Sequence, residues 1–201
     1  MALLGARAIE SPFTAAKLAG LKVGEAVLLS GRVFTGRDRL HKYLFDGGAS
    51  PVDLKDGAIY HCGPVVLGKP GAWVVRAAGP TTSAREEPYL PRIIEKHGVR
   101  VVIGKGGLGA ATQAACARWG CVYLHAVGGA AQVLAERIER VCAVCFADEF
   151  GQAEAMWELT VKDFPAIVAI DAHGRSLCRR VLDSSRRELR SLIRDSAPFV
   201  G

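Results

Sequence analysis

The chain has 201 residues, of which 50% are hydrophobic and 23% are charged. This balance excludes an intrinsically disordered chain, and the length predicts a single domain. The net charge of +6 suits an anionic partner or substrate, although the arginines near the C-terminus account for much of it.

Nothing in the sequence resembles a signal peptide or a membrane span. The first 20 residues contain Arg7, Glu10 and Lys17 and lack a continuous apolar core. The six cysteines are scattered, which favours free thiols in the cytoplasm over a disulfide framework. Cys142 and Cys145 form a C-x-x-C pair, but a zinc or cluster site needs three or four ligands. We therefore predict no metal ligand in this chain.

The first half of the chain predicts strands punctuated by glycine and proline. Residues 1–20 read as an N-terminal lead-in. Strands are predicted over residues 21–34, 58–62 and 73–78, each followed by turn residues. Between the first two, residues 38–45 predict a helix with Asp38 as its N-cap.

The middle of the chain alternates between helix and strand. Helices are predicted over residues 88–97, 108–119 and 129–140, and Gly98 and Gly120 end the first two. Short apolar strands are predicted over residues 100–103 and 121–125. Such alternation favours an α/β fold with parallel strand pairing.

The last part of the chain predicts an antiparallel meander and then a helix. Residues 156–164 alternate between apolar and polar side chains, as a half-buried strand does. Residues 166–170 and 176–178 predict two more strands around a turn, and residues 179–201 predict a basic C-terminal helix. The elements together predict one domain of mixed sheets with flanking helices over residues 21–178.

Three glycine-bearing loops follow predicted strands, and each carries a cation. If these loops converge, they form a pocket that suits a small dicarboxylate or a phosphate, because arginine binds a carboxylate through two N–H groups and lysine adds a compact charge. Each loop alone is better explained as a turn with a solvated cation, whereas the three loops together fit a pocket as well as they fit three turns. The residues concerned are Arg37, then Thr81, Thr82 and Arg85, then Gly104, Lys105 and Gly106.

The third loop also matches the dinucleotide-binding pattern G-x-G-x-x-G between a strand and a helix. That pattern requires an acidic residue at the end of the next strand, and residues 123–126 contain none. Binding of an anion at the helix N-terminus stays open. The sequence contains no nucleophile motif such as G-x-S-x-G, so demanding chemistry would have to come from a cofactor or a partner chain.

Several strings of the sequence are specific enough to compare with known families. They are SGRVFTGRD at 30–38 with HK at 41–42, YHCGP at 60–64, AGPTTSAR at 78–85, GKGG at 104–107, GGA at 128–130, EAMW at 154–157 and VKDFPA at 161–166. In this order they resemble the beta subunit, or C-terminal domain, of class I iron–sulfur fumarate hydratases and L(+)-tartrate dehydratases. The resemblance covers residues 21–177.

This resemblance implies a swivelling β/β/α domain and a role as the beta subunit of a hydro-lyase. Members hydrate fumarate to L-malate, or dehydrate tartrate to oxaloacetate. Their [4Fe–4S] cluster is held by cysteines of an alpha subunit, so the cysteines of this chain are not expected to be ligands. The implied partner is that alpha subunit, in an alpha2beta2 assembly, with a beta homodimer also possible.

The resemblance also implies roles for the loop residues. Thr81 is the expected proton-transfer hydroxyl, with Thr82 as the alternative. Arg37 and Arg85 are expected to bind the substrate carboxylates, and Lys105 completes the anion site. A tartrate substrate and a non-catalytic dicarboxylate-binding module stay open as alternatives. Binding to nucleic acid through the basic helix is disfavoured, because that helix lacks interleaved aromatic residues.

Overall fold

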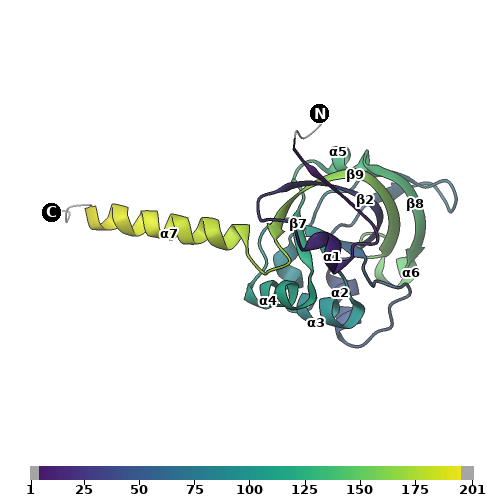
Figure 1. Cartoon of the computed structure of the whole chain (residues 1–201). Helices are drawn as coiled ribbons and strands as arrows, with labels where there is room; N and C mark the ends of the chain where they lie inside the picture. The colour runs from purple at the N-terminus through teal and green to yellow at the C-terminus, as the bar shows by residue number, and fades with distance from the viewer. Residues whose placement is uncertain (1–4, 196–201) are drawn as a thin grey trace, which may run out of the picture.

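A curved seven-stranded sheet forms the centre of the structure, a computed structural model that describes residues 5–195 (Figure 1). Strand β9 pairs with β7 and β8 and also returns to β2, so the sheet closes into a barrel that leaves β1 and β8 outside the ring. The strand order is β1 (Arg7–Glu10), β2 (Ala26–Thr35), β3 (Ala58–Tyr60), β6 (Val101–Gly104), β7 (Val122–His125), β9 (Met156–Ile170) and β8 (Ile138–Cys145).

The first five strands of this order are parallel, and the carboxyl ends of four of them are level. Thr35 of β2 pairs with Tyr60 of β3, Tyr60 pairs with Ile103 of β6, and Gly104 of β6 pairs with His125 of β7. The residues that follow these strands therefore lie side by side at one edge of the sheet. Ligands of parallel sheets bind outside this edge.

The sheet is buried on both sides, which explains why its central strands are almost entirely apolar. Val101 and Ile103 of β6 point into the barrel with Tyr60, whereas Val102 points outward to the helices with Ile94. Three helices cover this outer side: α2 (Asp38–Phe45), α3 (Leu90–His97) and α4 (Ala110–Trp119) (Figure 1).

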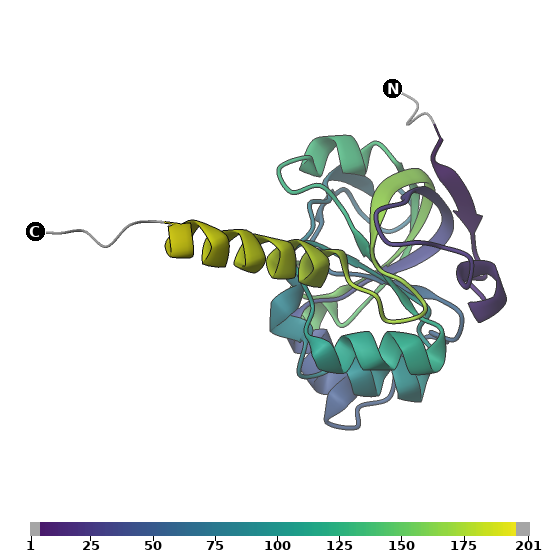
Figure 2. The same ribbon diagram turned by 60° about the vertical axis from the view of Figure 1, so that its left-hand side comes forward.

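Short elements connect these layers, and one long helix leaves them. The helix α7 (Leu177–Asp195) projects from the body (Figure 2). No helix within residues 5–195 has both the length and the apolar character that a bilayer crossing requires. The remaining elements are α1 (Ala15–Leu18), β4 (Val65–Leu67), β5 (Val74–Ala77), the 3₁₀ helix η1 (Ser83–Glu86), α5 (Ala131–Ala135) and α6 (Ala147–Phe150).

The predicted mixed α/β domain with flanking helices is confirmed, and most predicted elements are present. The segment predicted as a lead-in contributes β1, which pairs with β2. The predicted basic helix begins at Leu177 and is described as far as Asp195, and residues 196–201 of that prediction lie outside the described range.

Four local predictions are wrong. The strand predicted over residues 176–178 is absent, because helix α7 begins at Leu177 and Ser176 forms only an isolated bridge to Ile170. The helix predicted over residues 129–140 ends at Ala135, and strand β8 begins at Ile138 because that segment pairs with β9. The strands predicted over 156–164 and 166–170 form the single strand β9, which continues through Pro165 and pairs with three neighbours. Asp38 is the first residue of α2 rather than its N-cap, and the N-cap residue Arg37 makes no side-chain capping bond.

Candidate functional site

The loop that contains Thr81 runs between the ends of β3 and β6. The Thr81 N–H donates to the His61 carbonyl at 2.7 Å, and the Lys105 N–H donates to the Thr81 carbonyl at 3.3 Å. The Ser83 N–H then donates to the Lys105 carbonyl at 3.0 Å. These bonds extend the parallel sheet past its edge and bring the second and third predicted loops together.

The side chain of Thr81 is distinctive within this loop. Its hydroxyl oxygen Oγ1 is buried and forms no hydrogen bond within residues 5–195, whereas the neighbouring Thr82 is exposed. A buried hydroxyl without a partner is uncommon, because burial of a polar group is unfavourable unless it is hydrogen-bonded. Such a group is available to a ligand.

Both predicted arginines lie at the same edge, and each is paired with an acid. Arg85 binds Asp38 through two hydrogen bonds of 2.9 and 3.0 Å, and the Arg85 guanidinium lowers the pKa of Asp38. Arg37 lies 3.3 Å from Glu154, and its Nε is buried without a partner in the described chain. Since a guanidinium has five N–H groups, each arginine keeps donors that these acids do not use.

The lysine loop is shaped by close approach. A Cβ on Gly104 would collide with the Ser83 hydroxyl, so only glycine fits there. Gly106 has φ of +75°, a conformation that glycine adopts without strain. The half-buried Lys105 side chain passes over Gly128, which follows β7, and within residues 5–195 its ammonium forms no ion pair.

A buried polar network connects the Thr81 loop and the lysine loop. His61 Nδ1 lies 2.8 Å from Ser83 Oγ, and the Tyr123 hydroxyl oxygen lies 3.0 Å from both Ser83 Oγ and the Gly106 carbonyl oxygen, which share its single proton as acceptors. His61 thus holds the tripeptide 81–83 at both ends, through its carbonyl and its ring. His61 was not among the site residues predicted from the sequence. The one available signal was the place of His61 directly after β3, level with the other loops.

Two further buried groups lie beside this network. His41 packs edge-on against His61 with ring centroids 4.9 Å apart, and its Nδ1 lies 3.6 Å from Glu86 Oε2. Burial raises the pKa of Glu86 to about 8 and lowers the pKa of His41 to about 4. At neutral pH both groups are therefore uncharged, which is the state that a dry interior favours.

The N-terminus of α4 is occupied by a carboxylate of the chain itself. Glu87 accepts hydrogen bonds from Gly109 N, Thr112 N and Thr112 Oγ1 at 2.7, 3.2 and 2.7 Å. This acid satisfies the free N–H groups and the positive end of the helix dipole. The sequence left open that an anion binds at the N-terminus of this helix. The structure places the Glu87 carboxylate of the chain itself there, and the glycines of the third loop serve local packing.

The cysteines do not form a set that could hold an iron–sulfur cluster. All six are free, and no group of three or more His, Cys, Asp or Glu side chains within residues 5–195 is placed to bind a metal ion. Cys142 lies at a register shift of β8, with its thiol 3.3 Å from Thr160 Oγ1, and Cys145 pairs with Met156. A [4Fe–4S] cluster therefore does not fit the described part of this chain.

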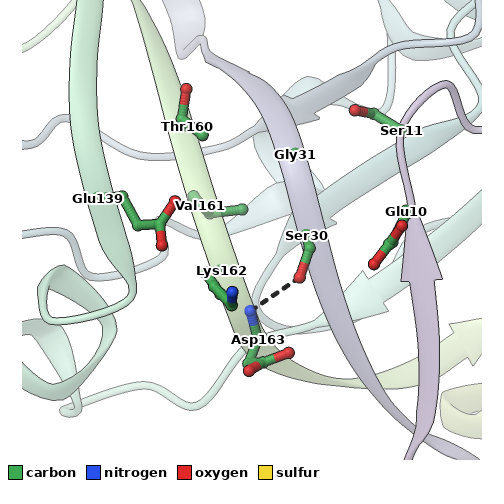
Figure 3. A pocket seen from close by; sticks show the side chains of 9 residues that line it. All are labelled: Glu10, Ser11, Ser30, Gly31, Glu139, Thr160, Val161, Lys162 and Asp163. Atoms are coloured by element: carbon green, nitrogen blue, oxygen red, sulfur yellow. Dashed lines mark hydrogen bonds between the residues drawn. The ribbon is translucent and has the colours of Figure 1, made fainter.

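The pocket in Figure 3 lies elsewhere. It has a volume of about 340 Å³ and is lined by residues of β2, β8 and β9 and by residues 10–11, among them Ser30, Thr160 and Asp163. The Asp163 N–H donates to Ser30 Oγ across this pocket at 3.0 Å. None of the seven predicted site residues lines it, so the carboxyl edge of the parallel strands remains the candidate site.

Comparison with known proteins gives consistent matches. Over 182 residues the chain is 52% identical to a putative fumarate hydratase class I of Geobacillus stearothermophilus, covering 90% of this chain and 35% of that protein. It is 39% identical over 178 residues to a putative L(+)-tartrate dehydratase subunit beta of Methanocaldococcus jannaschii, covering 86% and 91%. It is 36% identical over 171 residues to the L(+)-tartrate dehydratase subunit beta of Escherichia coli K12, covering 84% and 85%.

The chain thus spans only 35% of the first of these relatives but most of the two beta subunits. The family model described as Fumarase C-terminus matches residues 7–181, which include all seven predicted site residues. Because this match covers most of the chain, the resemblance is confirmed, and the chain belongs to the Fumarase C-terminus family.

Proposed function

We propose that the chain is the beta subunit of a hydro-lyase that hydrates fumarate to L-malate, and that it supplies one half of the active site. The observation that carries the proposal is the buried Thr81 hydroxyl, which has no hydrogen-bond partner in the described part of the chain and lies between loops that bear three cations. The relatives named fumarate hydratase and tartrate dehydratase subunit beta support the reaction class. Fumarate is favoured over tartrate because the relative with the higher identity is named for it.

In this proposal Thr81 moves the carbon-bound proton of the substrate. A threonine hydroxyl is a poor base in water, and burial by itself disfavours its alkoxide, so the positive charges of Arg85 and Lys105 would have to favour the charged form. Lys105 is adjacent through the backbone hydrogen bond to Thr81. The buried network under residues 81–83 would hold the hydroxyl in one position and so reduce the reorganisation that the reaction requires.

The cations of the site would bind the two carboxylates of the substrate. Arg85 retains N–H donors beyond those that Asp38 engages, and Arg37 Nε has no hydrogen-bond partner among the described residues. Lys105, presented by the loop that contains Gly104 and Gly106, would complete the anion site through its ammonium, because the Lys105 N–H donates to the Thr81 carbonyl and the Gly106 N–H donates to His125 Nε2. Two carboxylates held at fixed positions align the carbon chain with the Thr81 hydroxyl.

A partner alpha subunit would hold the [4Fe–4S] cluster, which supplies a Lewis acid for the substrate hydroxyl when bound. The absence of a suitable ligand set in the described chain, together with two relatives named as beta subunits, supports this division. We infer an alpha2beta2 assembly, a swivelling β/β/α domain over residues 21–178 that moves against the partner, and a cytoplasmic location that suits free cysteines.

Reconstitution tests the proposal. The full chain would be combined anaerobically with a cluster-loaded alpha subunit, and conversion of fumarate to malate would be followed, with tartrate as the second substrate. We expect activity from the pair and none from either chain alone. An inactive pair that still assembles would refute the proposal for both substrates. Turnover of tartrate alone would move the assignment to tartrate dehydratase.

A non-catalytic dicarboxylate-binding module is the second candidate, because the cations of the site belong to this chain alone. Calorimetric titration of the isolated chain with fumarate separates the two. Tight binding without a partner, combined with an inactive pair, would favour the module. Weak binding that strengthens in the pair supports the enzyme subunit.

A further inference from the structure

Helix α7 presents an apolar face that no other part of the described chain covers. Its 19 residues correspond to about 28 Å of helix at 1.5 Å per residue. The helix is attached at its base, where Cys178 lies against Gly107 of the lysine loop, and the rest points away from the body (Figures 1 and 2). Beyond this base, the exposed apolar side chains are Val181, Leu182, Leu189, Leu192 and Ile193, each 47–63% exposed.

A helix with this pattern is normally stabilised by packing of its apolar stripe against another element. The family match ends at residue 181, so most of the exposed stripe lies beyond the part that the family model describes. Family membership therefore does not identify the element that packs against this apolar stripe.

The spacing of the stripe is that of a coiled-coil seam. Residues 178, 182, 185, 189 and 192 are separated by four, three, four and three positions, which places them at alternating d and a positions of a heptad. Leucine stands at three of the five, with Cys178 and Ser185 as small residues at the other two. This pattern predicts that the occupant is another amphipathic helix.

The residues that flank the seam argue against a second copy of this chain. Arg179 and Arg186 occupy e positions, and Val181 and Glu188 occupy g positions. In a parallel self-pair Arg186 would face Val181, so no attractive e–g pair forms there. In an antiparallel self-pair the arginine-bearing edges would face each other, which is repulsive. A helix with acidic residues at the facing positions complements both arginines.

A lipid surface is a weaker fit. Helices that lie in the membrane interface combine a basic face with aromatic or leucine-rich apolar faces and are anchored by Trp or Tyr. Helix α7 contains no aromatic residue, and three of its five exposed apolar side chains, Leu182, Leu189 and Leu192, lie at seam positions. We propose that the apolar face of α7 binds an amphipathic helix of another protein, with Asp or Glu flanking its apolar seam. This inference does not depend on the proposed function.

Two synthetic helical peptides with identical leucine seams would test the inference, one with Glu and one with Lys at the flanking positions. Binding to the full chain would be measured by fluorescence anisotropy at low and high salt. We expect the full chain to bind the Glu peptide at least about tenfold more tightly than the Lys peptide. Leu189→Glu should abolish binding, and Ser184→Glu, which adds the same charge outside the seam, should leave it unchanged.

Charge reversal provides the decisive comparison. Arg186→Glu should shift the preference toward the Lys peptide, because it reverses a flanking charge and leaves the seam intact. Equal binding of both peptides, or no binding of the Glu peptide, overturns the inference. A dimer in light scattering that Leu189→Glu dissolves would show that a second copy is the occupant. Flotation of the full chain with phosphatidylserine vesicles, lost in Leu189→Glu, would assign the face to lipid.

Discussion

Asp38 and Arg85 are 47 residues apart in the sequence and form a two-pronged ion pair with distances of 2.9 and 3.0 Å. The pair joins the first residue of α2 to the 3₁₀ helix η1 that follows the Thr81 loop. It therefore sets the direction of one cation of the candidate site. The same acid that orients Arg85 also competes with a substrate carboxylate for it.

Asp38→Asn tests this orienting role. Both side chains are more than 40% exposed, so we expect a loss of unfolding free energy below about 1 kcal/mol. The KM of the reconstituted pair for its dicarboxylate should rise, because Arg85 loses its fixed direction. Asp46→Asn, which removes the exposed acid that pairs with Lys42, is the matched control and should leave KM unchanged. An unchanged KM in Asp38→Asn would remove Arg85 from the binding site.

The buried Glu86 predicts an alkaline decline in stability. Burial raises the pKa of Glu86 from about 4.5 to about 8, so the folded state holds the proton more tightly than the unfolded state does. Its contribution to stability is complete below about pH 4.5 and is lost as the pH rises through about 8. Glu86→Gln should flatten this decline in urea unfolding between pH 5 and 9.

The loss of stability at acid pH should be unaffected by Glu86→Gln, because it depends on His41. Burial lowers the pKa of His41 from 6.5 to about 4, so its contribution is present above about pH 6.5 and is lost as the pH falls through about 4. An equal alkaline slope in the wild type and Glu86→Gln would show that Glu86 does not titrate in this range.

The two glycines of the lysine loop should respond differently to alanine. Gly104→Ala introduces a Cβ that collides with Ser83 Oγ and lies 3.1 Å from His61 Nδ1. We expect a loss of about 2 kcal/mol or more, of the kind that overpacking of a core causes. Gly106→Ala meets open space and is disfavoured only by its positive φ, at about 1 kcal/mol. Equal melting temperatures for the two variants would contradict the close packing against Ser83.

Tyr123→Phe tests the network beneath the site. The change removes the hydroxyl that bridges Ser83 Oγ and the Gly106 carbonyl, and it leaves both groups without that hydrogen-bond partner. We expect a loss of about 1–3 kcal/mol and faster hydrogen exchange in residues 104–109, with exchange in α2 unchanged. Unchanged exchange in residues 104–109 would mean that the hydroxyl does not hold the lysine loop.

The sequence predicted the buried parallel strands and the glycine loops because these features are local. Strand Val101–Gly104 is an apolar run that ends in glycine, and Gly98 and Gly120 end helices in the left-handed conformation that favours glycine. The convergence of the loops followed from parallel pairing, which places strand ends at one edge.

Other features depend on contacts between distant residues and were not predictable from local pattern. Glu87 occupies the α4 N-terminus from 22 residues away, and Asp38 is recruited by Arg85 instead of capping its own helix. Strand β8 escaped detection because residues 138–145 carry no clear alternation, and pairing with β9 determines their conformation. The roles proposed for Thr81 and Lys105 remain predictions.

Thr81→Ala in the reconstituted pair tests the central claim most directly. Oγ1 has no partner within residues 5–195, so its removal should not lower the melting temperature or prevent assembly. We expect kcat for fumarate hydration to fall by about 10²–10⁴, the usual contribution of a positioned acid or base. Thr81→Ser, which keeps the hydroxyl, should retain much of the rate. A fully active Thr81→Ala pair, or an equal loss in Thr82→Ala alone, would contradict the assignment of Thr81 as the proton-transfer residue.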